Sequence, residues 1–347
     1  MPSTRSVFIS KNLKFEDFKR DGFIPILSAV IKILELITLA VFPLALHVIL
    51  TQSSEKMRYY KFLLSVQITV TTVLNTLVVL TNPIIIFPFK AAYMECVFEC
   101  DYTMTKIMYL VIVGSILCMA TSTALQLAYR IMVTYDDSHI LKKLCRPKVF
   151  TFITTGVFVV ATTVLFTPIA MDPPMGKGLK EILQYDFPAV IPIFEQHEFI
   201  MGYLPDHQGP VNFAITSFFA VSVGLIPLAI WLLFLMVRRL KEMKKSLQKH
   251  TYKVHAMLSR ALYVQVSLTV ILLIPLFVCL TAALVFSSVW GKVLLELAKL
   301  SISIYSICEV ITIMYFITPY REYLKKLFCL KNNRIENHTS SSQRYLS

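Results

Sequence analysis

The residues of this chain that could do chemistry inside its apolar stretches are a few charged side chains. Lys32 and Glu35 lie three residues apart in one stretch, and Lys299 and Glu309 lie in another. Side chains three apart share one face of a helix, so Lys32 and Glu35 can form an ion pair. Charged groups in apolar helices are costly and usually face the interior of a bundle. A structural ion pair, or snorkelling of the side chain to the membrane surface, is the first interpretation, and contact with a ligand or an activation switch is the second.

Catalytic and metal-binding patterns do not emerge from the sequence. It offers no nucleophile with a base and an acid, no glycine-rich phosphate loop, and no chain of acids for a proton relay. The spacing of Cys and His matches no zinc or haem pattern. We therefore predict that the protein is not an enzyme and holds no metal and no cofactor.

Long apolar segments dominate the chain and must position these charged groups. Mean hydropathy is +0.66 and 16% of the residues are charged, against about 25% in a typical soluble domain. A bilayer core about 30 Å thick needs about 20 apolar residues per helix, and backbone hydrogen bonding inside lipid requires such runs to be helical. The sequence predicts an all-α membrane protein, a bundle of seven transmembrane helices. The predicted spans are Phe23–Leu50, Tyr60–Phe87, Thr103–Val133, Val149–Ile169, Val211–Val237, Met257–Phe286 and Val293–Ile317.

The distribution of Lys and Arg predicts the orientation of the bundle. The segments that follow the first, third, fifth and seventh spans contain 22 of the 34, whereas the opposite side contains 9. Because basic residues collect in the cytoplasm, we place the N-terminus outside, although the basic N-terminal arm argues mildly the other way. The predicted organisation is an extracellular arm over 1–22, the seven-helix transmembrane domain over 23–318 and a cytoplasmic tail over 319–347. Anionic lipid and an acidic cytoplasmic partner account for the basic segments better than nucleic acid does.

The long outer segment Met171–Pro210 contains many prolines and aromatic residues. Prolines interrupt long helices, and the aromatic side chains favour a packed cap over a solvated linker. The segment has no cysteine, so no disulfide can tie it to the third span. Cys96 and Cys100 lie near the outer start of that span, but four residues apart on a helix they are poorly placed to pair. We therefore expect free thiols.

Prolines also fall within the predicted spans, at Pro43, Pro83, Pro168, Pro227 and Pro275. Each removes a backbone hydrogen bond and can kink a helix, although membrane helices tolerate proline. Pro275 is the predicted pivot, because it lies mid-span above the long basic segment Arg238–Tyr252.

Three local motifs carry a family resemblance. The most specific leads into the sixth span, and its matching residues are Thr251, Met257, Ala261, Leu262, Gln265, Ile274 and Pro275. The second is Pro319-Tyr320-Arg321 after the seventh span, and the third is Tyr129-Arg130 at the end of the third. With the seven-span plan, these residues resemble the nematode serpentine chemoreceptors of the Str superfamily, class H or class I. The chain departs from class H at Leu204-Pro205-Asp206, where that class often has Leu-Pro-Cys.

The resemblance implies a G-protein-coupled chemosensory receptor for a small-molecule ligand, in the plasma membrane of the sensory cilium. Ligand-contact candidates, taken to face inward from the outer halves of the helices, are Tyr102, Lys106, Tyr109, Phe213, Thr216, Phe219, Lys299 and Ser303. Candidates for activation or coupling to a heterotrimeric G protein are Tyr129, Arg130, Pro275, Pro319, Tyr320 and Arg321. For Arg130 the alternative is a simple anchor at the membrane interface. The alternative functions are a multi-pass transporter, a ligand-gated channel of the insect odorant-receptor type with its N-terminus inside, and a degenerate membrane enzyme.

The tail segment Tyr320–Leu330 alternates apolar and basic residues at helical spacing. That spacing predicts a short amphipathic eighth helix on the inner leaflet of the bilayer. Cys329 near its end is a candidate for palmitoylation, or a plain cytosolic thiol.

The tail also provides a test of the orientation. Asn337-His338-Thr339 is the only glycosylation sequon in the chain. A cytoplasmic tail does not meet the glycosylation machinery, so glycosidase treatment is expected to leave the electrophoretic mobility unchanged. A mass shift that disappears in Asn337→Gln would place the tail outside and reverse the topology.

Overall fold

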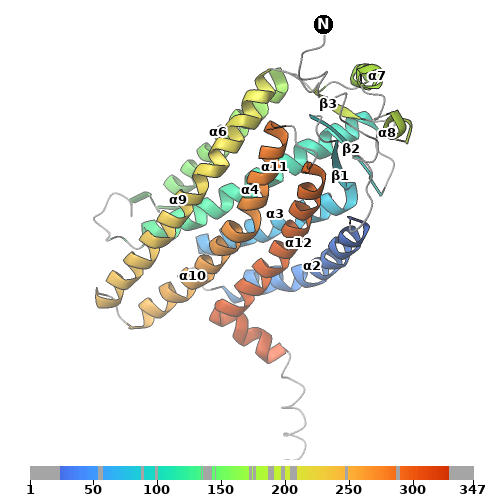
Figure 1. Ribbon diagram of the computed structural model, residues 1–347. Helices are drawn as coiled ribbons and strands as arrows, with labels where there is room; N and C mark the ends of the chain where they lie inside the picture. The colour runs from blue at the N-terminus through green and yellow to red at the C-terminus, as the bar shows by residue number, and fades with distance from the viewer. Residues whose placement is uncertain are drawn as a thin grey trace, which may run out of the picture.

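The computed structural model describes residues 24–53, 58–86, 90–97, 101–133, 135, 143–144, 146–171, 174, 177–186, 191–196, 200–203, 209–246, 249–286 and 290–327. Within these residues seven long helical segments form a bundle, with a small sheet at one end and a further helix at the other (Figure 1). The segments are α2 (Ile24–Gln52), α3 (Arg58–Thr81), α4 (Tyr102–Val133), α6 (Pro147–Met171), α9 (Pro210–Ser246), the continuous α10 (Lys249–Leu268), η4 (Thr269–Leu273) and α11 (Ile274–Val285), and α12 (Gly291–Phe316). We call the two ends of the bundle the sheet end and the tail end, and the helix over residues 318–327 the tail helix.

Five of these described segments are long and apolar enough to cross a membrane: α2, α3, α4, the α10–η4–α11 segment and α12. Helices α6 and α9, with 25 and 37 residues, take the fourth and fifth places in the order. Large apolar side chains point outward, as at Phe152 (80% exposed) and Phe234 (67% exposed), which is the surface that lipid covers. The predicted all-helical membrane bundle is confirmed.

The second predicted span was too long at its C-terminal end. Helix α3 ends at Thr81, Asn82 adopts a left-handed backbone with φ of 37°, and Pro83 begins a strand. Asparagine tolerates this conformation better than most residues do, and proline is accepted at the first position of a strand. Pro83 is therefore not a helix kink, whereas Pro43 and Pro227 do lie inside α2 and α9.

The sheet end is built from a hairpin and part of the predicted cap. Strands β1 (Pro83–Ile86), β2 (Lys90–Met94) and β3 (Met201–Tyr203) form an antiparallel sheet in that order. Strand β3 and the short helices α7 (Lys177–Asp186) and α8 (Ile191–Gln196) come from the segment predicted to be a packed cap, which the pairing of β3 with β2 confirms. The sequence did not predict the sheet itself.

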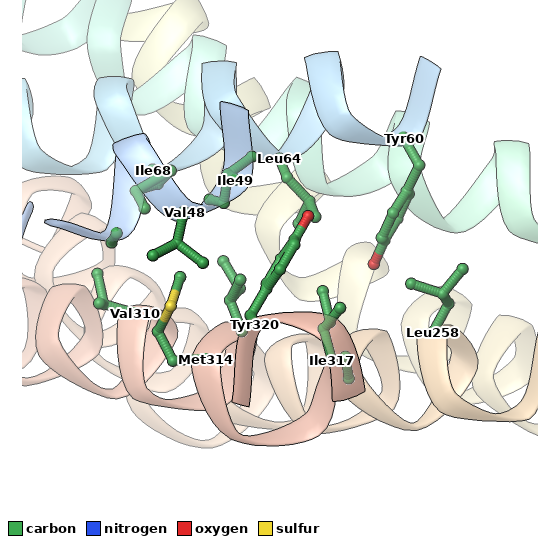
Figure 2. Close-up of a cluster of buried hydrophobic side chains, with 13 residues drawn as sticks. Val48, Ile49, Tyr60, Leu64, Ile68, Leu258, Val310, Met314, Ile317 and Tyr320 are labelled. Carbon is green, nitrogen blue, oxygen red and sulfur yellow. The ribbon is translucent and has the colours of Figure 1, made fainter. Parts of the chain in front are cut away.

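A cluster of apolar side chains closes the tail end (Figure 2). Val48 and Ile49 from α2, Leu64 from α3 and Val310 from α12 meet there, and Tyr320 of the tail helix is inserted between them with no exposed surface. The Tyr320 hydroxyl lies 2.6 Å from the Ser53 Oγ atom, and burial raises the pKa of its phenol.

The first turn of the tail helix is therefore held by the bundle core. The predicted eighth helix is confirmed over residues 318–327, and Leu327, 43% exposed, lies toward its free end. Cys329 lies outside the described residues.

This packing predicts how tightly Tyr320 holds the tail helix. Tyr320→Phe removes one hydrogen bond and should lower the free energy of unfolding by about 0.5–1.5 kcal/mol. Tyr320→Ala also leaves a cavity and should cost about 3–5 kcal/mol. Unfolding of the purified protein in detergent measures both, with the exposed Leu327→Ala as the matched control. An equal, small effect of Tyr320→Ala and Leu327→Ala would contradict the anchoring role.

Candidate functional site

Helix α12 carries an unusual number of polar side chains on its buried surface, among them Glu296, Lys299, Ser303, Tyr305 and Glu309. Water does not reach the interior of a membrane bundle freely, so such groups must satisfy one another. They do so in two clusters along α12, which we call the sheet-side and middle clusters. A third, the tail-side cluster, lies around Arg130 of α4.

The sheet-side cluster joins α12 to the sheet. The Lys299 Nζ atom lies 2.6 Å from the Glu296 Oε1 atom, and both side chains are almost fully buried. It also donates to Asn82 Oδ1 at 2.8 Å, and Asn82 Nδ2 donates to Glu95 Oε2 at 2.8 Å. Lys299 is thus a structural ion-pair partner, as the first interpretation held. Its partner Glu296 was missed, although the spacing of three residues could have identified it.

The same cluster joins α12 to α3 and α2. Ser303 Oγ donates to Asn75 Oδ1 at 2.7 Å, and the Asn75 amide donates in turn to the Glu35 carboxylate, as does Thr76 Oγ1. The predicted pair of Lys32 with Glu35 is wrong: Lys32 is exposed, whereas Glu35 is 4% exposed and faces α3. Hydrogen-bond donors on the neighbouring helix replace the expected cation.

The middle cluster surrounds the hydroxyl of Tyr305. Thr269 donates to this hydroxyl at 3.3 Å, and the hydroxyl donates to Glu309 Oε1 at 3.4 Å. Gln67 Nε2 donates to Thr123 Oγ1 at 3.0 Å and lies 3.5 Å from the same Tyr305 hydroxyl. The cluster therefore connects α3, α4, η4 and α12.

Thr269 opens η4, a π-helical segment that ends just before Pro275. Single π turns inside helices are frequent at functional sites, and proline removes one further hydrogen bond from the ladder. Pro275 as a pivot remains a prediction.

The tail-side cluster is centred on Arg130. Its guanidinium carbon lies 3.7 Å from the centroid of the Tyr60 ring, and the residue is 5% exposed. The phenols of Tyr129 and Tyr320 are its other electrostatic neighbours, and the Tyr129 ring packs against Phe150 with centroids 5.1 Å apart. Stacking on an aromatic face compensates a desolvated guanidinium. Arg130 thus lies inside the bundle among tyrosine side chains, and its part in activation remains a prediction.

The motif at the start of the tail helix is divided between core and surface. Tyr320 belongs to the core, Pro319 is exposed, and the Arg321 guanidinium carbon lies 6.0 Å from the Tyr315 ring centroid. Their part in coupling remains a prediction.

The ligand-contact candidates on α4 lie beneath the cap. Tyr102 donates from its hydroxyl to the carbonyl of Pro174 at 3.3 Å, and Tyr109 donates to the carbonyl of Tyr93 at 3.4 Å. Lys106, which lies between these two residues in the sequence, is half-buried. Tyr102 and Tyr109 thus place α4 against the cap and strand β2.

The candidates on α9 do not share this position. Phe213 is 74% exposed, and Thr216 is exposed with its hydroxyl bonded to its own helix at the carbonyl of Asn212. Their expected inward orientation is wrong, because this face of α9 points away from the bundle. Phe219 is half-buried.

The expectation of free thiols also needs correction. Cys96 forms a disulfide whose partner lies outside the described residues. Cys118, Cys279 and Cys308 are free. The segment Met171–Pro210 has no cysteine and cannot supply the partner.

The structure is a bundle of seven long helical segments with a cap at one end and a buried arginine toward the other. The family described as serpentine type 7TM GPCR chemoreceptor Srh matches residues 25–330, and the chain belongs to this family. The protein is therefore a multi-pass membrane receptor of the chemosensory kind, as the resemblance to nematode serpentine chemoreceptors indicated. No curated protein and no solved structure matched the chain.

The sheet-side cluster predicts a measurable coupling between α3 and α12. Asn75→Ala removes one hydrogen bond from the Glu35 carboxylate, which keeps Thr76, and one from the Ser303 hydroxyl, which keeps the carbonyl of Lys299. It should lower the free energy of unfolding by about 0.5–1.5 kcal/mol for each bond lost, and by more for the bond to the carboxylate. Ser303→Ala should cost less, and the double variant should cost less than the sum, by about 0.5–3 kcal/mol. Thr163→Ala on an exposed face of α6 is the control. Strict additivity would show that the Asn75–Ser303 hydrogen bond contributes nothing.

Proposed function

We propose that this receptor detects a small-molecule ligand at its sheet end and activates a heterotrimeric G protein at its tail end. The observation that carries the proposal is the family match over residues 25–330. By the distribution of Lys and Arg, the sheet end faces the outside and the tail end the cytoplasm. The plasma membrane of the sensory cilium is the proposed location, with residues 1–22 as an outer arm and 319–347 as a cytoplasmic tail.

The ligand binds between the cap and the outer half of the bundle. Ligand sites are mostly apolar with a few fixed polar groups, and Tyr102, Lys106 and Tyr109 supply these on α4. Lys299 and Ser303 lie deeper on α12. Lys299 is already paired with Glu296, and Ser303 already donates a hydrogen bond to Asn75. These two residues therefore sense a ligand indirectly, through changes in their hydrogen-bond partners. Their bonds also hold Asn82 and α3 against α12.

Activation shifts the population of bundle arrangements, because a ligand moves an equilibrium only by binding one state better than another. In the arrangement described here Arg130 is stacked on Tyr60 and shielded by the tail helix. Opening the tail end would free Arg130 and the basic end of α9 for an acidic surface of the G protein. Arg238 and Arg239 at that end are paired with Glu242 at 3.3 and 2.9 Å, in exposed bridges that are weak and exchangeable.

The test begins with a ligand screen in cells that express the chain, read by calcium and cyclic nucleotide. For a compound that activates the receptor, Arg130→Ala should abolish the response while surface expression, measured by an N-terminal tag on intact cells, is kept. Arg130→Lys should also lose most of the response, because a lysine keeps the charge but not the planar stack on Tyr60.

The matched control is Arg146→Ala, which changes an exposed arginine between α4 and α6. It should leave the dose response unchanged. A normal response in Arg130→Ala would exclude Arg130 from activation, and an N-terminal tag that is inaccessible on intact cells would contradict the orientation.

A further inference from the structure

The tail-side cluster contains a buried positive charge that no carboxylate of the described residues balances. Arg130 is 5% exposed, and its electrostatic neighbours in this part of the chain are the phenols of Tyr60, Tyr129 and Tyr320. None of the ion pairs found among the described residues includes Arg130. An arginine keeps its charge in proteins, and a buried charge without a counter-charge is expensive. The cluster therefore lacks one negative charge.

Hydrogen-bond donors are left over at the same place. The Nε and Nη2 atoms of Arg130 are buried without an acceptor in the described structure, and the hydroxyl of Tyr60, a residue 1% exposed, also has no partner there. The Tyr60 ring covers the face of the guanidinium, with its centroid 3.7 Å from the Cζ atom, so the N–H groups around the edge remain unused. A buried donor without an acceptor costs the full desolvation of the group. Orphaned donors this close together point to an acceptor that they share.

The nearest side chains are already committed to other contacts. Ser53 Oγ donates to the carbonyl of Ile49 at 2.6 Å and lies 2.6 Å from the Tyr320 hydroxyl. Because the single hydroxyl hydrogen of Ser53 goes to that carbonyl, the Tyr320 hydroxyl donates to Ser53. Tyr60 otherwise belongs to an apolar cluster, together with Leu258 (Figure 2). The missing acceptor is thus negatively charged and comes from outside this cluster.

We propose that the tail-side cluster binds one small anion of the halide class, chloride in the cell, between the edge of the Arg130 guanidinium and the Tyr60 hydroxyl. A chloride ion accepts several hydrogen bonds at once, and charge-assisted bonds of this kind are roughly twice as strong as neutral ones. One chloride balances one arginine. Tyr60 lies near the start of α3 and Arg130 near the end of α4, so the site is close to the tail end of the bundle, where ions can enter.

Burial selects a small ion over a larger acidic group. Tyr60 is 1% exposed and Tyr320 is not exposed at all, so the tail helix covers the cluster in the described arrangement. A lipid phosphate or a carboxylate of a partner protein is attached to a larger body, which would have to displace the tail helix to reach Arg130. A chloride ion needs no such opening, because it carries nothing outside the site.

The anion would help to hold the tail end closed. It would connect α3 to α4 beneath the tail helix, and a ligand that binds only one arrangement stabilises that arrangement. Arg130 is also the residue that we propose to meet the G protein, so chloride and an acidic surface of that partner would compete for it. This consequence rests on the proposed function, whereas the binding of the ion does not.

The test uses the purified full-length receptor and two measurements. Thermal unfolding is followed as sodium chloride replaces sodium gluconate at constant ionic strength, and the line width of the chloride-35 NMR signal measures binding directly. The wild-type midpoint should rise with chloride and saturate, and the receptor should broaden the signal. Tyr60→Phe keeps the stacked ring but loses one donor, so it should raise the half-saturating chloride concentration about 2–10-fold. Arg130→Met should abolish both responses.

Two matched controls separate loss of the site from a general loss of stability. Tyr305→Phe changes an equally buried tyrosine, 1% exposed, in the middle cluster, and Arg146→Met changes an exposed arginine. Both should keep the wild-type half-saturating concentration. Should Arg130→Met not fold, Tyr60→Phe and the wild-type line width decide.

Three results would each overturn the proposal: no chloride response of the wild type, the wild-type response in Arg130→Met, or an unchanged half-saturating concentration in Tyr60→Phe. Neither measurement reads signalling, so failure here leaves the proposed receptor function untouched.

Discussion

Polar groups within a membrane bundle must find partners inside it, and most of this structure depends on that constraint. Helix α12 brings the demand, because its buried surface carries carboxylates, a lysine, serines and a tyrosine. Asn75 of α3 and Glu35 of α2 supply hydrogen-bond partners, and Asn82, directly before strand β1, supplies another. Helices α2, α3 and α12 thus form a frame held by directional bonds. Helices α6 and α9 expose apolar surface, as at Phe152 and Phe234.

From this division we predict a fixed part of the receptor and a part that changes on activation. The sheet-side and middle clusters follow α12, and the tail-side cluster around Arg130 lies beyond them on α3, α4 and the tail helix. Spatial continuity alone does not establish coupling, which requires an element with two arrangements. The α10–η4–α11 segment fits that requirement: its π turn and Pro275 weaken the helical ladder at mid-span. Below them, Leu258 and Leu262 hold α10 to the core by apolar packing.

The sequence predicted what length, hydropathy and charge determine, and it missed what depends on contacts between distant segments. The seven spans match the helices closely, because a bilayer demands long apolar runs whatever their partners. Strand β1 was assigned to a helix, because a short apolar strand directly after a helix resembles its continuation. Its partner β2 has no alternating pattern that would have identified it as a strand. Glu35 was paired with Lys32, three residues away, because helical spacing cannot reveal Asn75, which lies 40 residues away in the sequence. Arg130 was found through a motif, but its stack on Tyr60 was not.

The central claim is that the α3–α12 frame stays fixed while the tail half of α10 moves. Nitroxide labels at exposed sites near the tail end test this directly, with Tyr315 on α12 and Phe62 on α3 as the frame pair, and Tyr315 and Arg260 on α10 as the moving pair. Distances are measured by double electron–electron resonance in lipid nanodiscs, with and without an agonist and a nucleotide-free G protein. The account predicts an unchanged distribution for the frame pair and a new, longer population for the moving pair. Lengthening of the frame pair with no change in the moving pair would contradict it.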